Sequence, residues 1–576
     1  MKKLAIFAAA FVLTLGLAQC KKEQPNAQNL EGKTVHLTVN VNNNGSRADI
    51  QDPSSGQYDF KDGDKLYVGY NNAKVEGELT YSTTTSSFSG NLTIAQSGSQ
   101  RLHFYYLGGS LTPTVSGSKY TVDIRNQTSD YPVISYGTST INYSENVGSY
   151  TTTLLNKCAL VKFTLASGTT DVVAVGGMMT QATIDFANPG VVTPGAAGEI
   201  KLYAGASDTE KWAILLSQSA VDNAPVAIGD GYLGYMVGVP AIEDNDFAPN
   251  INTIDNSETA NANVVILNRL TNDYTATNDQ VLTGTLANNV KISIADGATV
   301  TLGGVSINAN GAWTSGNYAG ITCVGNATII LKDGTTNTVK GFYRNYPGIH
   351  VPEGSTLTIK GGAAGTGKLT ASSNGYGAGI GGGYEKHCGN IEIQGGDITA
   401  NGGEGVAGIG GGGVTSCGTI TISGGTIKVK GGDRAAGIGS GAGGEQGEGS
   451  SCGAITISGG TVTATGGWEA AGIGSGCEAS CGDITISGGI VTATGGKYAA
   501  GIGSGYHEAS CGAITITTGV TSVTATKGKD APNSIGAGIG SSCGTVTIGC
   551  TLDGNGIPVG GQTGPVTTSP YTYQPQ

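Results

Sequence analysis

Aromatic and charged residues recur at two fixed places in the C-terminal half of the sequence, and side chains of this kind could bind a carbohydrate. The first set follows a Gly-Gly pair and the second follows a Gly-Ile-Gly segment. Aromatic ring faces with charged groups beside them suit a linear polysaccharide. The residues expected to contact it are Tyr384, Glu404, Asp433, Arg434, Trp468, Glu469, Tyr498 and Tyr506. The alternative interpretation is that these are solvent-facing turn residues without a ligand.

Two lysines form a second candidate feature. In the segment Thr426-Ile-Lys-Val-Lys430, Lys428 and Lys430 replace the threonines of other units, and Arg434 follows shortly after. A chain with a net charge of −12 needs such a basic patch, or Ca²⁺ as a bridge, to bind a polyuronate. The alternative is that the two lysines only increase solubility.

The cysteines favour a buried stack over a disulfide framework. Six of the 11 cysteines precede a glycine, at intervals of 29 to 35 residues: Cys388, Cys417, Cys452, Cys481, Cys511 and Cys543. Such regular spacing marks one position of a repeat, so we expect the small thiol side chains to stack in the interior. Cys477 and Cys481 lack a second Cys/His pair, which leaves zinc binding a weak alternative.

These residues belong to a unit that repeats from about residue 264. A Gly-Ile pair recurs every 28 to 37 residues, with its isoleucine at 321, 349, 380, 409, 438, 473, 502 and 539. Each unit holds three short segments, Ile-Thr-Ile, Thr-Val-Thr-Ala-Thr and Ala-Gly-Ile-Gly, which predict one coil of a parallel β-helix. We expect about eight coils over residues 264–565, followed by a tail at 566–576.

Alternation within a unit predicts which side chains fill the core. In the unit at 454–476, Ile455, Ile457, Val462, Ala464 and Ile473 are expected to point inward and the threonines outward. The glycines of the Ala-Gly-Ile-Gly segment are expected to leave a flat outer face that a sugar ring can approach. The longer intervals predict loop insertions at 442–450 and near 527–534.

Composition excludes several other classes of protein. Glycine accounts for 99 of 576 residues and opposes helix formation, while the acidic net charge argues against a nucleic-acid partner. The segment 362–368 nearly matches a phosphate-binding loop, but Leu369 takes the place of the required Ser or Thr and no helix follows. The glycines at 408–413 likewise lie in a β unit without the helix that a dinucleotide site needs.

Residues 33–258 contain no repeat and predict a separate region. Alternating apolar runs at 34–41, 65–70, 102–107 and 160–165 are typical of half-buried strands between Asn, Gly and Ser turns. No segment has helical periodicity, so an antiparallel β-sandwich is expected. The Asn-, Asp- and Thr-rich stretch at 249–263 predicts the junction with the repeats.

The first 20 residues predict export and lipid attachment. A charged start, an apolar run from Leu4 to Ala18 and then Cys20 have the order of a secretory signal, and the run is too short to span a bilayer. Leu17-Ala18-Gln19-Cys20 resembles a bacterial lipobox, which implies removal of residues 1–19, lipidation of Cys20 and a linker over 20–32. We therefore expect attachment to the outer membrane through acyl chains, with the protein exposed at the cell surface. The alternative is an ordinary secretory signal.

Several segments of the N-terminal region carry a family resemblance. Besides the lipoprotein start, they are Asn44-Gly-Ser-Arg-Ala48, Asp62-Gly-Asp-Lys-Leu-Tyr-Val68 and Leu155-Asn-Lys-Cys-Ala-Leu-Val-Lys-Phe163. Together they resemble the fimbrillin-like (Mfa-like) family of fimbrial subunits and anchors. The resemblance implies fimbrial subunits as partners that join by strand addition, with Arg47-Ala48 as the exchange or processing site.

The repeats carry a second resemblance. The segments 294–302, 326–334 and 348–359, with the later Gly-Ala-Gly-Ile-Gly and Ser-Gly-Gly units, are similar to a family of secreted right-handed β-helix proteins that bind carbohydrate. This resemblance implies acidic, pectin-like polysaccharides as ligands and an association with calcium.

Three functions follow as hypotheses. The first is a cell-surface adhesin or glycan-capture protein that binds polysaccharide through the β-helix without catalysis. The second is a polysaccharide lyase or hydrolase, for which Asp433 and Arg434 are the candidate lyase residues in the repeats. The third is a fimbrial anchor or tip subunit.

Overall fold

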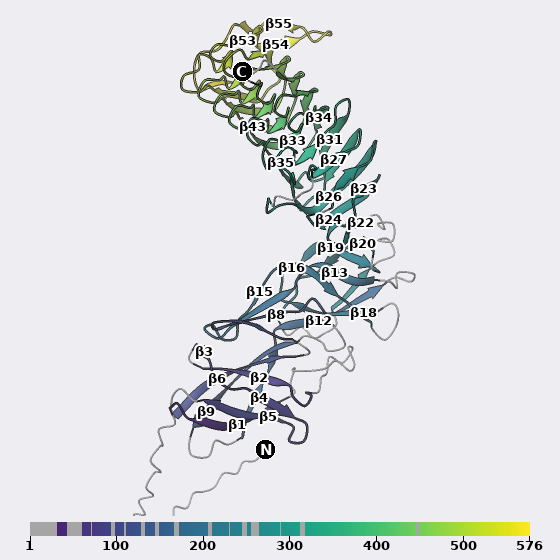
Figure 1. Cartoon of the computed structure of the whole chain (residues 1–576), viewed down its shortest axis with the longest axis vertical. Helices are drawn as coiled ribbons and strands as arrows, with labels where there is room; N and C mark the ends of the chain where they lie inside the picture. Colours follow the sequence, from purple (N-terminus) through teal and green to yellow (C-terminus); the bar gives the residue numbers. More distant parts are fainter. Residues whose placement is uncertain are drawn as a thin grey trace, which may run out of the picture. The chain divides into compact units, whose positions relative to one another are not determined.

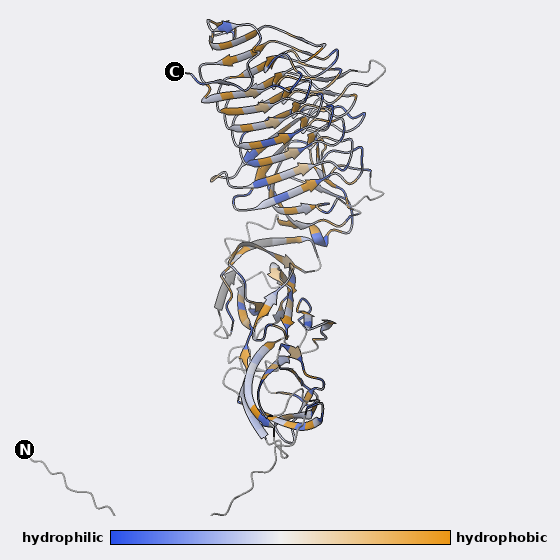
Figure 2. Ribbon diagram, turned by 90° about the vertical axis from the view of Figure 1, so that its left-hand side faces the viewer, coloured by the Kyte–Doolittle hydropathy of each residue, from blue (hydrophilic) through white to orange (hydrophobic). Residues whose placement is uncertain are grey.

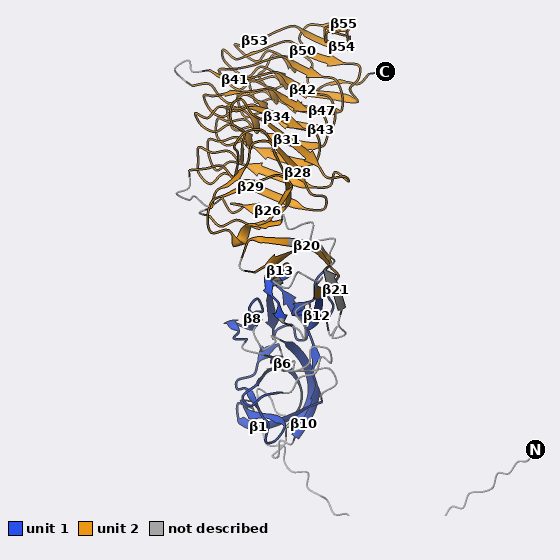
Figure 3. Cartoon of the chain, turned by 90° about the vertical axis from the view of Figure 1, so that its right-hand side faces the viewer, with its two compact units in different colours: residues 1–163, 178–219, 241–251 blue, residues 164–177, 220–240, 252–576 orange. Residues whose placement is uncertain are grey.

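The structure is a computed structural model. It describes residues 31–42, 60–70, 72–93, 98–108, 111–127, 133–143, 149–165, 172–204, 210–229, 231–244, 250–254, 264–288, 290–311, 317–444 and 449–575. The predicted signal segment, Cys20 and Arg47-Ala48 lie outside the described residues. Two compact units are present: unit 1 comprises 1–163, 178–219 and 241–251, and unit 2 comprises 164–177, 220–240 and 252–576 (Figure 3). Among the described residues, no helix is long and apolar enough to cross a membrane.

Unit 1 consists of β-sheets whose strands are mostly antiparallel. The largest sheet has the order β10-β1-β5-β4-β2-β6-β9-β11, with β3 beside β2. Its strands are β1 (Thr34–Asn42), β2 (Lys65–Tyr70), β3 (Ala73–Lys74), β4 (Leu79–Ser82), β5 (Ser87–Thr93), β6 (Gly98–Leu107), β9 (Ile134–Tyr143), β10 (Ser149–Thr153) and β11 (Leu155–Asn156). A smaller sheet contains β7 (Thr114–Ser116), β8 (Lys119–Asp123), β14 (Gln181–Asp185) and β15 (Val192–Pro194). This arrangement agrees with the expected β-sandwich.

Aromatic rings fill part of the core of unit 1. The Phe60 ring lies 4.9 Å from the Phe88 ring, 5.1 Å from Tyr106 and 5.2 Å from Tyr81, measured between ring centroids. Phe88 and Tyr106 are fully buried. Such tilted and edge-to-face pairs add to the stabilisation that burial of the rings provides.

Unit 2 is a parallel β-helix, in which the strands of successive coils stack in register (Figure 1). We divide its parallel strands into rows A to D. Row A contains β24 (Gln280–Thr285), β26 (Ala298–Ile307), β28 (Ala327–Leu331), β31 (Thr356–Gly361), β34 (Asn390–Ile393), β38 (Ile420–Ile422), β42 (Ile455–Ile457), β46 (Ile484–Ile486), β50 (Ile514–Thr517) and β54 (Val546–Leu552). Row B contains β29 (Thr336–Lys340), β32 (Lys368–Ser372), β35 (Asp397–Asn401), β39 (Thr426–Lys430), β43 (Thr461–Thr465), β47 (Ile490–Thr494) and β51 (Ser522–Thr526).

The two remaining rows consist of shorter strands. Row C contains β23 (Tyr274–Ala276), β25 (Ile292–Ile294), β27 (Ile321–Cys323), β30 (Ile349–His350), β33 (Ile380–Gly381), β36 (Ile409–Gly410), β40 (Ile438–Gly439), β44 (Ile473–Gly474), β48 (Ile502–Gly503) and β52 (Ile535–Gly536). Row D contains β37 (Ser416–Cys417), β41 (Ser450–Cys452), β45 (Ala479–Cys481), β49 (Ser510–Cys511) and β53 (Ser542–Cys543). Row D was not among the three segments expected for each coil.

The core of unit 2 consists of ladders of aliphatic side chains, many of which are identical from coil to coil. Ile420, Ile455, Ile484 and Ile514 are neighbours in register, and each is fully buried. Full burial of one such side chain contributes about 1.5–3 kcal/mol to the free energy of folding. All five side chains predicted to point inward from the unit at 454–476 are buried, which confirms the prediction. Figure 2 shows the resulting alternation of hydrophobic and hydrophilic residues along the strands.

The predicted thiol stack is also confirmed. Each of the six Cys-Gly cysteines pairs in register with the next, from Cys388 to Cys543. All six are free thiols in the structure. Adjacent coils lie about 4.8 Å apart, so cysteines at the same position of successive coils have their sulfur atoms next to each other.

The last coil differs from the sequence-based expectation. Ile535, and not Ile539, pairs with Ile502, so the prediction that Ile539 continues the isoleucine ladder is wrong. Both isoleucines lie in Ser-Ile-Gly-Ala-Gly-Ile-Gly540, and only Ile535 has an Ile-Gly strand that fits the row C register. The backbone N–H of Ile539 instead donates to the carbonyl of Tyr498 at 3.0 Å.

Both ends of the β-helix are covered by antiparallel strands. At the start, β19 (Val221–Ile228) pairs with β13 (Val172–Met179) and β20 (Leu233–Val239), and β20 pairs with β22 (Val264–Ile266), the neighbour of β24. At the finish, β57 (Tyr571–Tyr573) pairs with β51, although residues 566–576 were expected to be a tail. Covering the terminal strands blocks edge-to-edge association with other chains.

His350 in row C gives unit 2 a predictable response to acid. Its Nε2 is buried without a hydrogen-bond partner among the described residues. Burial lowers the pKa of His350 to about 4, and the positive charges of Lys386 and Lys291 act in the same direction. The folded protein therefore binds this proton less readily than the unfolded chain, in which histidine has a pKa of about 6.5.

We expect His350→Gln to reduce the acid sensitivity of unit 2. The contribution of His350 is fully present above pH 6.5 and is lost progressively toward pH 4, by up to about 3 kcal/mol of unfolding free energy. Urea unfolding of wild type and variant at pH 7 and pH 4.5 measures the difference. Equal changes in unfolding free energy between the two pH values would contradict the prediction.

Candidate functional site

The turns on either side of the row C strands lie next to each other. Around the row C strand β44, the N–H of Ala471 donates to the carbonyl of Ser475 at 3.1 Å, and in the preceding coil the N–H of Ala436 donates to the carbonyl of Ser440. Gly474, which lies between Ala471 and Ser475, has a φ of +135°, and this angle bends the chain. The segment therefore closes into a loop, whereas the sequence had suggested a strand with its two turns at opposite ends.

Backbone hydrogen bonds join the two sets of turns into one surface. The N–H of Cys477 donates to the carbonyl of Arg434 at 2.8 Å, and the N–H of Tyr506 donates to the carbonyl of Glu469 at 2.9 Å. Each bond links the second turn of one coil to the first turn of the preceding coil. The residues that vary from coil to coil are thereby collected on one side of the β-helix.

A groove with a volume of about 420 Å³ lies on this surface. Six of the residues predicted to contact carbohydrate line it: Tyr384, Glu404, Asp433, Arg434, Trp468 and Glu469. The remaining lining residues are Tyr376, Gly405, Gly413, Val414, Ala442 and Gly443. The spacing of the variable turns was thus sufficient to find half of the residues that line the groove. The glycines, Val414 and Ala442 were missed because they are neither aromatic nor charged, and Tyr376 was missed because it lies outside the two turn patterns.

Arg434 is held in the groove by two carboxylates. Its Nη2 lies 3.0 Å from an oxygen of Glu478, and its Nε lies 3.4 Å from an oxygen of Glu469. The hydrogen bond that Arg434 donates to the sulfur of Cys477, together with the Glu478 carboxylate, raises the pKa of the guanidinium. Arg434 therefore keeps its charge and has a fixed direction, which is a means of orienting a polar ligand.

Two other carboxylates in the groove are available to a ligand. Glu404 and Asp433 are exposed, and within the part of the chain that the structure describes neither has an ion-pair partner. Carboxylate oxygens accept hydrogen bonds and can do so from hydroxyl groups of a ligand. The groove thus presents free acceptors beside a paired guanidinium.

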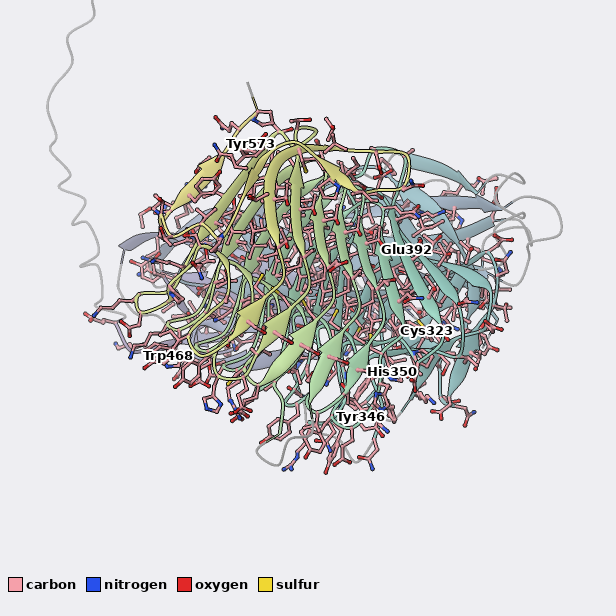
Figure 4. The ribbon with its side chains drawn as sticks, turned by 90° about the horizontal axis from the view of Figure 1, so that it is seen from above. Cys323, Tyr346, His350, Glu392, Trp468 and Tyr573 are labelled. Atoms are coloured by element: carbon pink, nitrogen blue, oxygen red, sulfur yellow. The ribbon has the colours of Figure 1, made fainter. Side chains whose placement is uncertain are left out.

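Tyr498 and Tyr506, the other two predicted aromatic residues, do not line the groove but form a run of rings that begins at Trp468. Trp468 is 58 % exposed, and its ring lies 6.5 Å from that of Tyr498, which in turn lies 4.8 Å from Tyr506. The ammonium group of Lys497 lies 5.3 Å from the centre of the Trp468 ring and 4.5 Å from that of Tyr498. In Figure 4, Trp468 and Tyr346 both project from the margin of the coils, away from Tyr573.

The two lysines of the expected basic patch lie elsewhere. Lys428 and Lys430 are exposed on β39, where Lys428 is in register with Thr399 and Thr463. Neither lysine lines the groove. The prediction that both point outward holds, but the structure does not bring them together with Arg434 in the groove.

The expected flat glycine face is absent, so that prediction is wrong. The glycine that follows the row C isoleucine is buried in the six coils from Gly381 to Gly536, and its φ lies between +130° and +136°. A Cβ on Gly474 would lie 1.8 Å from the carbonyl oxygen of Gly503 in the next coil. Glycine is therefore required for the bend and for close packing between coils, and not for access of a ligand.

One turn position beside the groove has a backbone conformation that is unusual for residues with a side chain. At this position in four coils, Glu385, Val414, Glu478 and His507 have φ values of 52–56°, and Gly443 occupies the position in the coil between Val414 and Glu478. This left-handed region is rarely occupied by residues other than glycine, and least by β-branched valine. Strained residues of this kind concentrate at binding sites, where the surrounding structure holds them in place.

The expected Ca²⁺ bridge stays a prediction, because such an ion would also take carboxylate ligands from the polysaccharide. In the described ranges, no group of three or more His, Cys, Asp or Glu side chains has an arrangement that could hold a metal ion. The carboxylates of Glu469 and Glu478, which could have contributed, pair with Arg434. No step of the function proposed below involves a metal.

Comparison with solved structures finds fimbrial and adhesion proteins. They include a candidate cell adhesion protein from Bacteroides uniformis (17 % identity, 34 % of this chain and 79 % of that one, TM-score 0.25) and a fimbrial assembly protein from Parabacteroides distasonis (11 %, 37 % and 88 %, 0.25). A third is the fimbrial anchor protein Mfa2 from Porphyromonas gingivalis (9 %, 35 % and 76 %, 0.21). Similarity at this level carries no functional argument. No curated protein sequence matches the chain.

A family profile described as "Beta helix repeat" matches the sequence four times. The matched residues are 391–413, 420–442, 455–477 and 484–506. Each match begins at the row A strand of a coil and ends in the second turn, so that it includes the loop around the row C strand. These four segments are therefore β-helix repeats both by sequence profile and by structure.

Proposed function

We propose that this protein is a cell-surface adhesion protein that binds a linear polysaccharide along the groove of its β-helix and leaves it chemically unchanged. The observation that carries the proposal is the groove itself, in which an exposed tryptophan lies beside free carboxylates and a fixed guanidinium. Large exposed aromatic rings on a protein surface are typical of binding sites. Surface location follows from the predicted lipidation of Cys20, which remains an expectation.

Recognition would use two kinds of contact. The ring of Trp468 offers an apolar face on which the C–H face of a sugar ring can pack, and Tyr384, which also lines the groove, offers a second such face. Glu404 and Asp433 would accept hydrogen bonds from sugar hydroxyl groups, and Arg434 would donate to ring or hydroxyl oxygens. Because coils rise about 4.8 Å each, a chain lying along the stack meets a new pair of turns at regular steps.

The charge of the groove favours a neutral polysaccharide over a polyuronate. Three carboxylates line it against one guanidinium, and that guanidinium is already paired with Glu469 and Glu478. A polymer with one carboxylate per sugar would be repelled by Glu404 and Asp433. The experiment must therefore distinguish a neutral polysaccharide from the acidic, pectin-like ligand that the family resemblance implies.

Affinity electrophoresis of the mature chain tests the proposal. Gels containing a neutral linear galactan, a neutral xylan or polygalacturonate are run with and without EDTA. We expect retardation by a neutral polymer and no effect of EDTA. Retardation only by polygalacturonate, abolished by EDTA, would favour the calcium-bridged alternative, and no retardation by any polysaccharide would contradict glycan binding.

A further inference from the structure

The thiol stack of row D ends in a pair of cysteines that differs from the others. Cys543 lies on β53, the last strand of the row, and among the described strands its neighbour in that sheet is β49. The sulfur atoms of Cys511 and Cys543 are 2.9 Å apart. Neighbouring parallel strands lie at a Cα separation of about 4.8 Å, within the range in which a disulfide can form. The pair is therefore placed for a covalent bond without movement of the coils.

The two thiols of this pair differ in access to solvent. Cys543 is partly exposed, whereas Cys388, Cys417, Cys452, Cys481 and Cys511 are at most 7 % exposed. A hydrogen bond from Cys511 lowers the pKa of Cys543, and the same contact raises that of Cys511. Burial raises the pKa of Cys481 and of Cys417. Reactivity of the stack is thus concentrated at its exposed end, because the thiolate is the nucleophile.

We propose that Cys511 and Cys543 form a redox-active dithiol, a disulfide modification site that fastens the last coil of the β-helix to the coil before it. The co-reactant is a disulfide of low molecular weight or of a dithiol-oxidising protein. The Cys543 thiolate attacks one sulfur of that disulfide, which forms a mixed disulfide and releases one thiol. Cys511 then loses its proton and attacks the Cys543 sulfur, which forms the Cys511–Cys543 bond and releases the second thiol. Two protein thiols are oxidised and one external disulfide is reduced.

The bond would stabilise the end of the β-helix that has no further coil to pack against. It would link β49 to β53 and close the chain segment between Cys511 and Cys543, which contains the row A, row B and row C strands of that coil. Cross-linking restricts the unfolded chain and so opposes fraying of the segment. The reaction itself depends only on the two thiols and is independent of the proposed glycan binding.

Oxidation with glutathione disulfide tests the proposal. The purified mature chain is incubated with it, unfolded, alkylated with iodoacetamide and digested, and peptides are mapped by mass spectrometry. We expect a cross-linked peptide pair that contains Cys511 and Cys543, and two fewer alkylated cysteines than in the untreated protein. In the native protein, limited proteolysis should release the C-terminal segment more slowly after oxidation than before.

Single substitutions distinguish the two steps. Cys511→Ser should accumulate glutathione on Cys543, because no thiol resolves the mixed disulfide, whereas Cys543→Ser should accumulate none. The control Cys452→Ser, in the middle of the stack, should still form the cross-link. Equal glutathionylation of Cys543 in wild type and Cys511→Ser, or a cross-link that maps to another pair in the folded protein, would overturn the proposal.

Discussion

Replacement of Gly474 by alanine is expected to lower the unfolding free energy of unit 2 by about 3–5 kcal/mol. The added Cβ would lie 1.8 Å from the carbonyl oxygen of Gly503, and the backbone φ of +135° is accessible almost only to glycine. Overpacking and backbone strain each cost about 1–3 kcal/mol, and here both apply to one residue. Urea unfolding followed by circular dichroism measures the change.

A matched control separates this effect from the general cost of replacing a glycine. A Cβ added to Gly554 would have no atom within 4 Å, and the φ of this residue is not left-handed, so Gly554→Ala should leave the unfolding free energy nearly unchanged. The same difference is expected between Gly503→Ala and the control, since the Cβ at Gly503 would lie 2.0 Å from the carbonyl oxygen of Gly536. A Gly474→Ala variant as stable as wild type would show that the coils can separate locally, contrary to the packing described here.

The parallel β-helix could be predicted from the sequence because its signal is repeated. Successive coils repeat an alternation of aliphatic and polar residues, so that one correct assignment, such as Ile455 and Ile457 pointing inward, applies to the equivalent positions of the other coils. Register is equally constrained, since a shift by one residue would expose the isoleucines. The signal fails where the repeat is ambiguous, as in Ser-Ile-Gly-Ala-Gly-Ile-Gly540, in which two isoleucines compete for one position.

The loop around the row C strand could not be predicted from the same pattern. Ala-Gly-Ile-Gly alternates like a strand, and nothing in its composition states that the second glycine has a φ near +135°. That single backbone angle determines the site, because it brings the two sets of variable turns together. The sequence therefore identified six of the residues that line the groove but not their arrangement as one surface, and their binding of carbohydrate stays a prediction.

Replacement of Trp468 by alanine is expected to weaken glycan binding by about 30-fold, equivalent to about 2 kcal/mol, if the proposed function is correct. Trp468 is the most exposed aromatic ring of the groove and also contacts Tyr498 and the ammonium group of Lys497. Truncation removes the apolar face on which a sugar ring packs, whereas Trp468→Phe keeps part of it and should lose less affinity. Affinity electrophoresis in gels with a graded concentration of the retained polysaccharide gives the dissociation constants.

Ile490 provides the control for this measurement. Its side chain is 41 % exposed on β47, in row B, and it does not line the groove. Ile490→Ala therefore removes an exposed apolar side chain of the β-helix and should leave affinity unchanged. Equal loss in Trp468→Ala and Ile490→Ala would point to a general effect on the coils, and an unchanged affinity in Trp468→Ala would move the binding surface away from the groove. Since Trp468 points away from the core, its replacement should not alter the unfolding free energy by more than about 0.5 kcal/mol, so that binding and stability are tested separately.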